Sequence, residues 1–336
     1  MLLVASDPVF AEHDTGRGHP ERPVRLEAVM AGVARAGLDD ALRSLAVRPA
    51  TAEELERVHS RVHLDEVRAL CERGGGAIDA DTVVSGRSWE AAVTAAGSGL
   101  AAAEALERGE GDAAFLALRP PGHHATPERS MGFCLINNVA VTAAALAERG
   151  QRVAVVDFDA HHGNGTQDVF YRDPRVLYVS LHQWPLYPGT GRLDDTGRDA
   201  GAGTTCNLPL PAGTTGDVYL AALDDVIIPV VERFEPHWLL LSAGFDGHRA
   251  DPLTGLSLAA DDFGLITARL AALVPAGRRI AFLEGGYDLD ALTRSVATTL
   301  PSLVGAVAPR EEPPSSGGPG HVVVDAARQL WAELTV

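Results

Sequence analysis

Cysteine is scarce in this chain of 336 residues. The three cysteines, Cys71, Cys134 and Cys206, are odd in number and lie far apart. That spacing excludes a disulfide framework and also a metal site built on closely spaced cysteine pairs. We therefore expect reduced thiols and a cytoplasmic protein.

Basic side chains are also few. The chain has 28 Lys and Arg residues against 45 Asp and Glu residues, which gives a formal net charge of −17. Because a nucleic-acid backbone is bound through positive charge, this balance argues against a nucleic-acid partner and favours cationic ligands. The sequence leaves a homo-oligomer open.

Long apolar runs are missing as well. No stretch approaches the roughly 18 consecutive apolar residues that a membrane span requires. The N-terminal stretch MLLVASDPVF has no basic residue ahead of its apolar residues, and Asp7 and Pro8 interrupt it. We expect neither a signal peptide nor a membrane anchor there.

Helix-like and strand-like segments alternate from about residue 88 onward. The strand-like segments are 112–118, 152–158, 175–181, 238–242 and 279–283, and the helix-like segments are 88–108, 137–149, 217–233, 259–274 and 288–304. This alternation predicts an α/β fold, an open and mostly parallel sheet with helices on both faces. The first 85 residues give a weaker pattern, with a strand near 2–5 and helices near 23–36 and 52–72.

One stretch has the composition of a linker. It is Pro309–Gly320, with the sequence PREEPPSSGGPG, and it lies too near the end of the chain to separate two domains. We predict a single domain over 1–308, followed by a Pro/Gly-rich linker and a short C-terminal segment over 309–336.

Polar clusters follow five of the predicted strands directly. In chain order they are RPPGHH with His123 and His124, DFDAHHGNG with Asp157, Asp159 and His161, then His182, AGFDGH with Asp246, and EGGYD with Tyr287. In an open parallel sheet the ligand crevice lies beyond the carboxyl ends of the strands, so these clusters should meet at one edge. Gly285 and Gly286 suit a place where the backbone approaches a ligand closely.

The segment DFDAH has the spacing of a metal site. Alternate residues of an extended segment point to one side, which groups Asp157, Asp159 and His161. One carboxylate, one imidazole and a second carboxylate from a neighbouring strand end suit catalytic zinc with an open position, and Asp246 is the best candidate for that third ligand. The same donors also suit ferrous iron. The alternative is that Asp159 is a turn residue and His161 an ordinary polar neighbour.

Tandem histidines in a rigid segment suggest proton transfer. His123 and His124 follow two prolines and a glycine, which suits an acid/base pair held beside a metal-activated water. The alternative is an ordinary surface turn.

These motifs together resemble the zinc-dependent histone deacetylase family. The matching segments, which occur in family order, are HPERPVRL at 19–26, RPPGHHA at 119–125, GFCLINN at 132–138, DFDAHHGNGTQ at 157–167, SLHQ at 180–183, YPGTG at 187–191, SAGFDGHRADPLTG at 242–255 and EGGYD at 284–288. They are most similar to the class II branch and to its bacterial deacetylase-like and acetylpolyamine amidohydrolase relatives. The resemblance implies the arginase/deacetylase fold, with the active site at the C-terminal ends of the strands.

The resemblance also implies two cation sites. Asp159, His161 and Asp246 would bind one zinc ion. A structural potassium ion would be held by Asp157, Asp159, His161, Ser180 and Leu181, partly through backbone carbonyls.

Catalytic roles are implied by the same motifs. His123 and His124 resemble the acid/base histidines, and Tyr287 resembles the tyrosine that donates a hydrogen bond to the scissile carbonyl. Asp157 would orient His123. Asn164 stands where class I members have an aspartate facing the second histidine, so we predict a more neutral His124, which favours it as the general base.

Several residues are expected to contact the substrate. They are Gly132, Phe133, Tyr187, Leu253, Gly285 and Gly286. Leu253 occupies the position where polyamine-selective relatives have a glutamate, which weakens a polyamine substrate. Asp79 or Asp81 could hold the substrate backbone or a cationic amine, or be merely solvated.

The expected activity is zinc-dependent hydrolysis of an amide. It would remove an acetyl or another short acyl group from acyl-lysine side chains or related small acylated amines. The readings that stay open are an acetylpolyamine amidohydrolase, a ureohydrolase relative with two manganese ions, and a non-catalytic acyl-lysine-binding protein.

Overall fold

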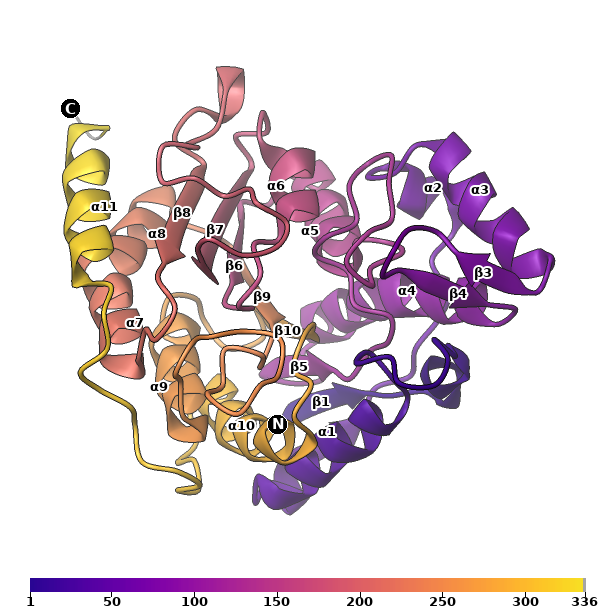
Figure 1. Cartoon of the computed structure of the whole chain (residues 1–336), viewed down its shortest axis with the longest axis horizontal. Coiled ribbons are helices and arrows are strands. Elements are labelled where there is room, and N and C mark those ends of the chain that lie inside the picture. The colour runs from indigo at the N-terminus through magenta and orange to yellow at the C-terminus, as the bar shows by residue number, and fades with distance from the viewer. Residues whose placement is uncertain (335–336) are drawn as a thin grey trace.

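An eight-stranded sheet forms the centre of the protein (Figure 1). The computed structural model describes residues 1–334, and its strands follow the order β2-β1-β5-β10-β9-β6-β7-β8 with every pairing parallel. The strands are β1 (Leu2–Ala5), β2 (Leu42–Ser44), β5 (Ala113–Leu116), β6 (Val153–Asp157), β7 (Val176–Gln183), β8 (Thr205–Leu210), β9 (Trp238–Ala243) and β10 (Arg279–Leu283). The predicted open, parallel α/β sheet is confirmed.

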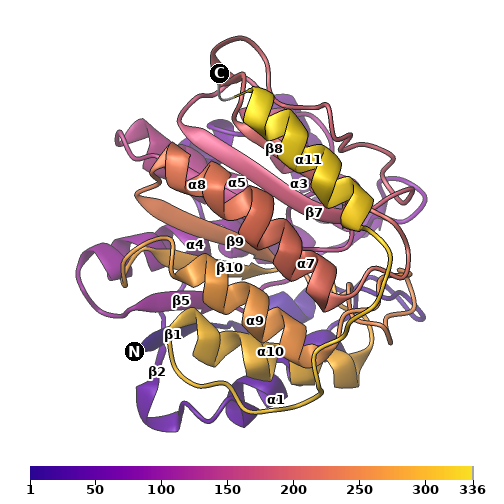
Figure 2. The same cartoon turned by 90° about the vertical axis from the view of Figure 1, so that its left-hand side faces the viewer.

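Helices cover both faces of this sheet (Figures 1 and 2). One face carries α1 (Val24–Arg35), α7 (Gly216–Ala222), α8 (Ile228–Phe234), α9 (Ala260–Ala271), α10 (Leu289–Leu303) and α11 (His321–Glu333), and the other carries α4 (Ser88–Glu107) and α5 (Asn138–Glu148). A small antiparallel pair, β3 (Gly75–Ala77) and β4 (Val83–Ser85), lies against α3 (Arg61–Glu72).

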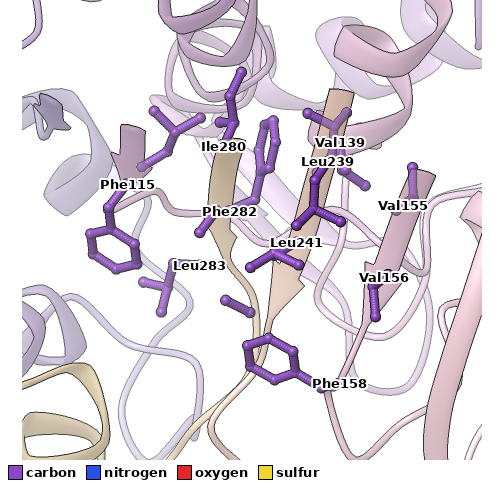
Figure 3. Close-up of a cluster of buried hydrophobic side chains, with 14 of the residues drawn as sticks. Phe115, Val139, Val155, Val156, Phe158, Leu239, Leu241, Ile280, Phe282 and Leu283 are labelled. Carbon is purple, nitrogen blue, oxygen red and sulfur yellow. The ribbon is translucent and has the colours of Figure 1, made fainter. Parts of the chain in front are cut away.

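The core lies between the sheet and its helices (Figure 3). Leu239, Leu241 and Phe282 on the central strands are fully buried. Parallel strands covered on both faces are expected to be continuously apolar, which explains the segments WLLLS and RIAFL. Beyond β6, the ring of Phe158 packs against Phe245 with centroids 6.3 Å apart, which closes the core beneath the carboxyl edge of the sheet.

Side-chain caps fix where two helices, α5 and α10, begin. At the start of α5, Asn137 Oδ1 accepts a hydrogen bond from Ala140 N (3.0 Å), and its Nδ2 donates to Ala125 O (3.1 Å). At the start of α10, Asp288 Oδ1 accepts a hydrogen bond from Ala291 N (2.8 Å). Such caps satisfy free N–H groups of the first turn and set where each helix begins.

Some elements differ from the prediction. The helix expected over 52–72 is two helices, α2 (Ala52–Glu56) and α3, because Ser60 leaves the helix and accepts a hydrogen bond from His63 N (3.3 Å) as the N-cap of α3. The elements β8, α6 (Asn164–Phe170) and α11 have no predicted counterpart. β8 contains Pro209, and proline is tolerated there because β8 is an edge strand.

The predicted linker is held against the helices, and we call residues 309–320 the C-terminal strap. It runs from the end of α10 past α9 and α7 to α11, which packs on α7 and β8 (Figure 2). Backbone N–H groups of Glu311 and Glu312 donate to Asp261 Oδ1 (2.8 and 3.1 Å). Ser315 Oγ donates to Asp262 Oδ2 (2.6 Å), so the strap is tied to the first turn of α9.

Two predictions about what the chain lacks can be compared with the described residues. Among residues 1–334, no helix combines the length and apolarity needed to cross a membrane. Cys71, Cys134 and Cys206 are buried and unbridged, as expected.

Candidate metal centre and catalytic cavity

The predicted polar clusters follow strands that are neighbours in the sheet. β5, β10, β9 and β6 lie side by side in that order although they are far apart in the sequence. The loop after β5 carries His123, the loop after β6 carries Asp159 and His161, the loop after β9 carries Asp246, and the loop after β10 carries Tyr287. The expected convergence at the carboxyl edge of a parallel sheet is therefore observed.

Asp159, His161 and Asp246 form a compact group of candidate metal ligands. One donor atom from each residue lies within 4.8 Å of the other two. His161 Nδ1 is 2.8 Å from Asp246 Oδ2 and 3.3 Å from Asp159 Oδ1. Both carboxylates are at most 1% exposed. Two buried carboxylates and one imidazole suit a divalent ion such as zinc or ferrous iron.

The backbone holds both carboxylates in place. Ala160 N donates a hydrogen bond to Asp246 Oδ1, and Gly285 N donates one to Asp159 Oδ2. Both N···O distances are 2.8 Å. A Cβ atom at Gly244 would lie 1.9 Å from Asp159 Oδ2, and one at Gly285 would lie 2.5 Å from Asp246 Oδ2. The glycines let the backbone approach the carboxylates this closely. The three donor residues, held closely by the backbone at Gly244 and Gly285, therefore fit a bound metal ion.

The tandem histidines have different partners. His123 Nδ1 is 3.0 Å from Asp157 Oδ2, whereas His124 Nδ1 is 2.8 Å from Asn164 Oδ1. The two rings lie with their centroids 4.1 Å apart. Both histidines are less than 5% exposed. Asp157 is therefore placed to orient His123, and the neutral Asn164 faces His124.

These surroundings drive the pKa values of the two histidines in opposite directions. Burial disfavours the charged form of both rings. For His123 the negative charges of Asp157 and Asp159 outweigh burial and raise its pKa well above the usual value. For His124 burial, together with the positive charge of His123, lowers its pKa well below the usual value. The direction for His124 agrees with the prediction, although burial is the main cause.

A cavity of about 220 Å³ opens onto the metal group. The residues that line it are Asp81, His123, His124, Gly132, Phe133, His161, Leu186, Tyr187, Leu253 and Tyr287. Tyr187 is 37% exposed and Leu253 is 36% exposed, so they lie at the mouth. Eight of these ten lining residues were predicted site residues, and Asp81 is the one of the two candidate acidic residues that reaches the cavity.

The wall at Gly132 and Phe133 depends on an unusual backbone. Both residues have a positive φ, 56° and 68° respectively. A Cβ atom at Gly132 would lie 2.5 Å from His124 Cδ2, so only glycine fits beside that ring. Phe133 N donates to Thr82 Oγ1 (3.2 Å), and the ring of Phe133 stands edge-on to that of Tyr287 with centroids 5.9 Å apart. Such a strained position is typical of functional sites.

Gly285 and Gly286 have contacts other than the expected ones. Neither lines the cavity. Gly285 N holds Asp159, and Gly286 O accepts a hydrogen bond from Arg25 Nε (2.7 Å). The guanidinium carbon of Arg25 lies 4.9 Å from the centroid of the Tyr287 ring. Sequence reasoning missed Arg25, because an arginine in the first turn of a helix gives no local sign of being buried.

The residues expected at a potassium site are neighbours. Asp157 on β6 and Ser180 on β7 are register partners, and both are fully buried. Ser180 Oγ lies 2.9 Å from His182 Nδ1. Leu181 O, the next carbonyl along β7, accepts a weak hydrogen bond from the Tyr219 hydroxyl (3.4 Å).

Comparison with protein families gives one domain match over most of the chain. Residues 19–303 match the histone deacetylase domain. This range contains the whole metal group and every cavity-lining residue.

Individual proteins are similar over comparable lengths. A probable deacetylase of Archaeoglobus fulgidus is 39% identical over 287 residues, which cover 84% of this chain and 80% of that protein. A histone deacetylase-like amidohydrolase of Pseudomonas aeruginosa is 41% identical over 277 residues, which cover 81% of this chain and 73% of that protein. The crystal structure of the HDA15 HD domain aligns with a TM-score of 0.90 and 34% identity, covering 99% of this chain and 94% of that one.

Proposed function

Because the chain belongs to the histone deacetylase family, we propose that it is a zinc-dependent amidohydrolase that removes acetyl or another short acyl group from acyl-lysine side chains or related small amines. One observation carries the proposal. The donor atoms of Asp159, His161 and Asp246 lie within 4.8 Å of one another beside a cavity that is also lined by His124 and Tyr287.

One divalent ion fits the site better than two. Asp159, His161 and Asp246 would hold zinc, which when bound supplies a Lewis acid for the amide carbonyl and for water. Asp251 is the next carboxylate along the loop, and it accepts hydrogen bonds from Leu253 N (2.9 Å) and Tyr287 N (2.7 Å). These contacts direct the Asp251 carboxylate to the backbone, so it is not free to bridge a second metal ion.

The side chains around the metal group have different roles in proton transfer. The lowered pKa of His124 leaves it neutral and able to accept a proton from water. Burial raises the pKa of Tyr287 well above its usual value, so its hydroxyl stays protonated and donates a hydrogen bond to the developing oxyanion. Protonated His124 or His123 then delivers a proton to the leaving amine. The Asp157 hydrogen bond supports His123 in its charged form.

The cavity favours an extended and largely apolar acyl chain. Its volume of about 220 Å³ is small, and Phe133, Tyr187 and Leu253 contribute apolar or aromatic walls. Leu253 at the mouth offers no carboxylate for the second amine of a polyamine. Asp81 is the one carboxylate among the lining residues of this cavity, and it can hold a backbone N–H or an ammonium group.

A structural potassium ion is a second part of the proposal. Asp157 and Ser180 are buried register partners, and Leu181 O follows directly on β7. The ion would hold the strand ends that carry Asp159 and His161. Location in the cytoplasm and the lack of a nucleic-acid partner stay predictions.

A substrate panel tests the proposed activity. Purified protein with a defined zinc content is assayed on acetylated peptides, acetylated polyamines and small N-acetyl amines, and the metal is counted by emission spectroscopy. All 28 basic residues of the chain are arginine, so the protein carries no lysine and cannot itself contribute acetyl-lysine to the readout. We expect one zinc per chain and turnover of acetyl-lysine peptides. Two metal ions per chain, or no turnover of any substrate, would overturn the proposal.

A further inference from the structure

The C-terminal strap brings one carboxylate to the loop that carries Asp246. Glu312 is in the strap, and its side chain is 13% exposed. Its Oε2 accepts hydrogen bonds from His248 Nε2 (2.8 Å), Arg294 Nη1 (3.3 Å) and Ala260 N (3.3 Å). Its Oε1 pairs with Arg249. A single carboxylate therefore joins the strap to the loop after β9, to the first residue of α9 and to the second turn of α10.

His248 is fixed from both sides of its ring. Its Nδ1 accepts a hydrogen bond from Ala250 N (3.1 Å), so Nε2 carries the proton and donates it to Glu312. The side chain is 1% exposed, which leaves it no solvent to replace either partner. Asp251 N in turn donates to His248 O (2.8 Å). The imidazole thus sets the course of the backbone from His248 to Asp251.

This short loop supports three parts of the site. Asp246 lies two residues before His248 and is one of the proposed zinc ligands. Asp251, three residues after His248, accepts the hydrogen bond from Tyr287 N and one from Leu253 N. A displacement of His248 would therefore shift a metal ligand, the backbone of Tyr287 and the mouth of the cavity.

We propose that Glu312 is a positioning residue for the reaction, acting through His248 on Asp246 and Tyr287. This inference rests on the proposed function. Glu312 touches neither the cavity nor the metal group, so its effect is on geometry alone. Replacing a residue that hydrogen-bonds to a metal ligand commonly lowers metal affinity or activity by about 10 to 100-fold. Glu312 does not touch a ligand itself and acts through His248, so its effect should lie at the lower end of that range. The expected loss is about tenfold.

The neighbouring residue in the strap provides a matched control. The Glu311 side chain is directed away from the loop and pairs with Arg35 on α1 (2.6 Å). Removing either carboxylate loosens the strap, but only Glu312 contacts His248. If the strap only stabilised the fold in general, replacing Glu311 or Glu312 by alanine would have the same effect on zinc affinity and kcat.

The test compares Glu312→Ala, Glu312→Gln and Glu311→Ala in the full chain. The measurements are zinc affinity by competition with a chromophoric chelator, kcat and KM at saturating zinc, and the free energy of unfolding in urea. We expect Glu312→Ala to weaken zinc binding and lower kcat by about tenfold each, with KM little changed, because the metal ligand and the tyrosine act mainly in the transition state. Glu312→Gln should recover most of the loss, because its amide oxygen still accepts from His248 Nε2. Glu311→Ala should change stability only.

Three results would overturn the inference. One is an equal loss of zinc affinity and kcat in Glu311→Ala and Glu312→Ala, another is no loss in Glu312→Ala, and the third is a Glu312→Gln variant as impaired as Glu312→Ala. A double variant with His248→Ala adds a further check, because residues acting in series give non-additive losses. If the wild-type chain itself binds no zinc and turns over no substrate, the proposed function fails; if it does both while Glu312→Ala behaves as the wild type, only this inference fails.

Discussion

Two of the places where the protein buries carboxylates balance the negative charge in different ways. Glu21 is fully buried and accepts hydrogen bonds from Arg119 Nε (2.5 Å) and Nη2 (2.7 Å) and from Arg25 Nη1 (3.0 Å). Asp159 and Asp246 are equally buried, but within residues 1–334 no arginine forms an ion pair with either of them. Their partners are histidine nitrogens and backbone N–H groups.

The pKa values reflect this difference. Burial by itself raises the pKa of a carboxyl group. At Glu21 the two arginines outweigh burial and lower the pKa to about 2. At Asp246 burial, together with the negative charge of Asp159, raises the pKa. At Asp159 burial also favours the neutral form, but the positive charges of His123 and His161 outweigh it and lower the pKa. The charge of Glu21 is thus balanced by two arginines, whereas the carboxylates of the metal group have histidines as their charge partners.

The largest expected effect comes from removing a ligand of the metal group, which should abolish metal binding and activity. Asp159→Ala is expected to lose zinc and about 1000-fold or more in activity, because the Lewis acid contributes several kcal/mol to the transition state. Zinc content by emission spectroscopy and kcat/KM on an acetyl-lysine peptide check this. Asp194→Ala, at an exposed ion pair with Arg192, serves as the control. Stoichiometric zinc in Asp159→Ala would show that the ligand is wrongly assigned.

Removing an arginine from the buried group of Glu21, Arg25 and Arg119 should lower the stability of the fold instead. Arg119→Met leaves Glu21 buried with Arg25 as its remaining arginine, and loss of one partner of a buried pair costs about 3–5 kcal/mol. The free energy of unfolding in urea measures it. Arg149→Met, at the part-exposed pair with Glu107, should cost less than about 1 kcal/mol. Equal losses at both positions would contradict the idea that burial makes the Glu21 group different.

Removing the Tyr287 hydroxyl should separate chemistry from metal binding. Tyr287→Phe is expected to lower kcat about 100 to 1000-fold, the usual cost of one oxyanion donor, while zinc content stays at one per chain. Tyr171→Phe, outside the cavity lining, is the control. Full activity in Tyr287→Phe would remove the tyrosine from the mechanism.

Acid should affect the Glu21 group within a defined pH window. The folded-state pKa of Glu21, about 2, lies below the value of 4.5 for a free side chain, so its stabilising contribution is present above pH 4.5 and is lost as the pH falls toward 2. The shift corresponds to about 3 kcal/mol. Unfolding free energies measured between pH 6 and pH 2 should fall less steeply in Arg119→Met than in the wild type. Parallel slopes would mean that Arg119 does not set the pKa of Glu21.

The sequence predicted the fold where the pattern is local and repetitive. The segments that become β6, β9 and β10 are continuously apolar because both of their faces are covered. The α4 segment is long and rich in alanine, and the α10 segment has a long periodic pattern. The edge strand β8 and the seven-residue α6 were missed, because a short segment with polar residues or proline has no clear periodicity.

The candidate site was predictable because its chemistry follows strand ends. Asp159, His161 and Asp246 were grouped from the topology of a parallel sheet, and the structure brings their donor atoms together. The contacts of Gly285 with Asp159 and of Arg25 with Gly286 O were not predictable, because each joins backbone or side-chain atoms from distant segments.

The amino-acid order by itself determined which side chains follow each strand, and thus the kind of chemistry this protein can carry, because strand patterns and the residues after them are local. Only the tertiary structure decided which carboxylates are neutralised and by what. Glu21 lies 98 residues from Arg119, and His248 lies 64 residues from Glu312. Charge pairing in a buried place depends on which loops and helices pack together, and no local pattern records that.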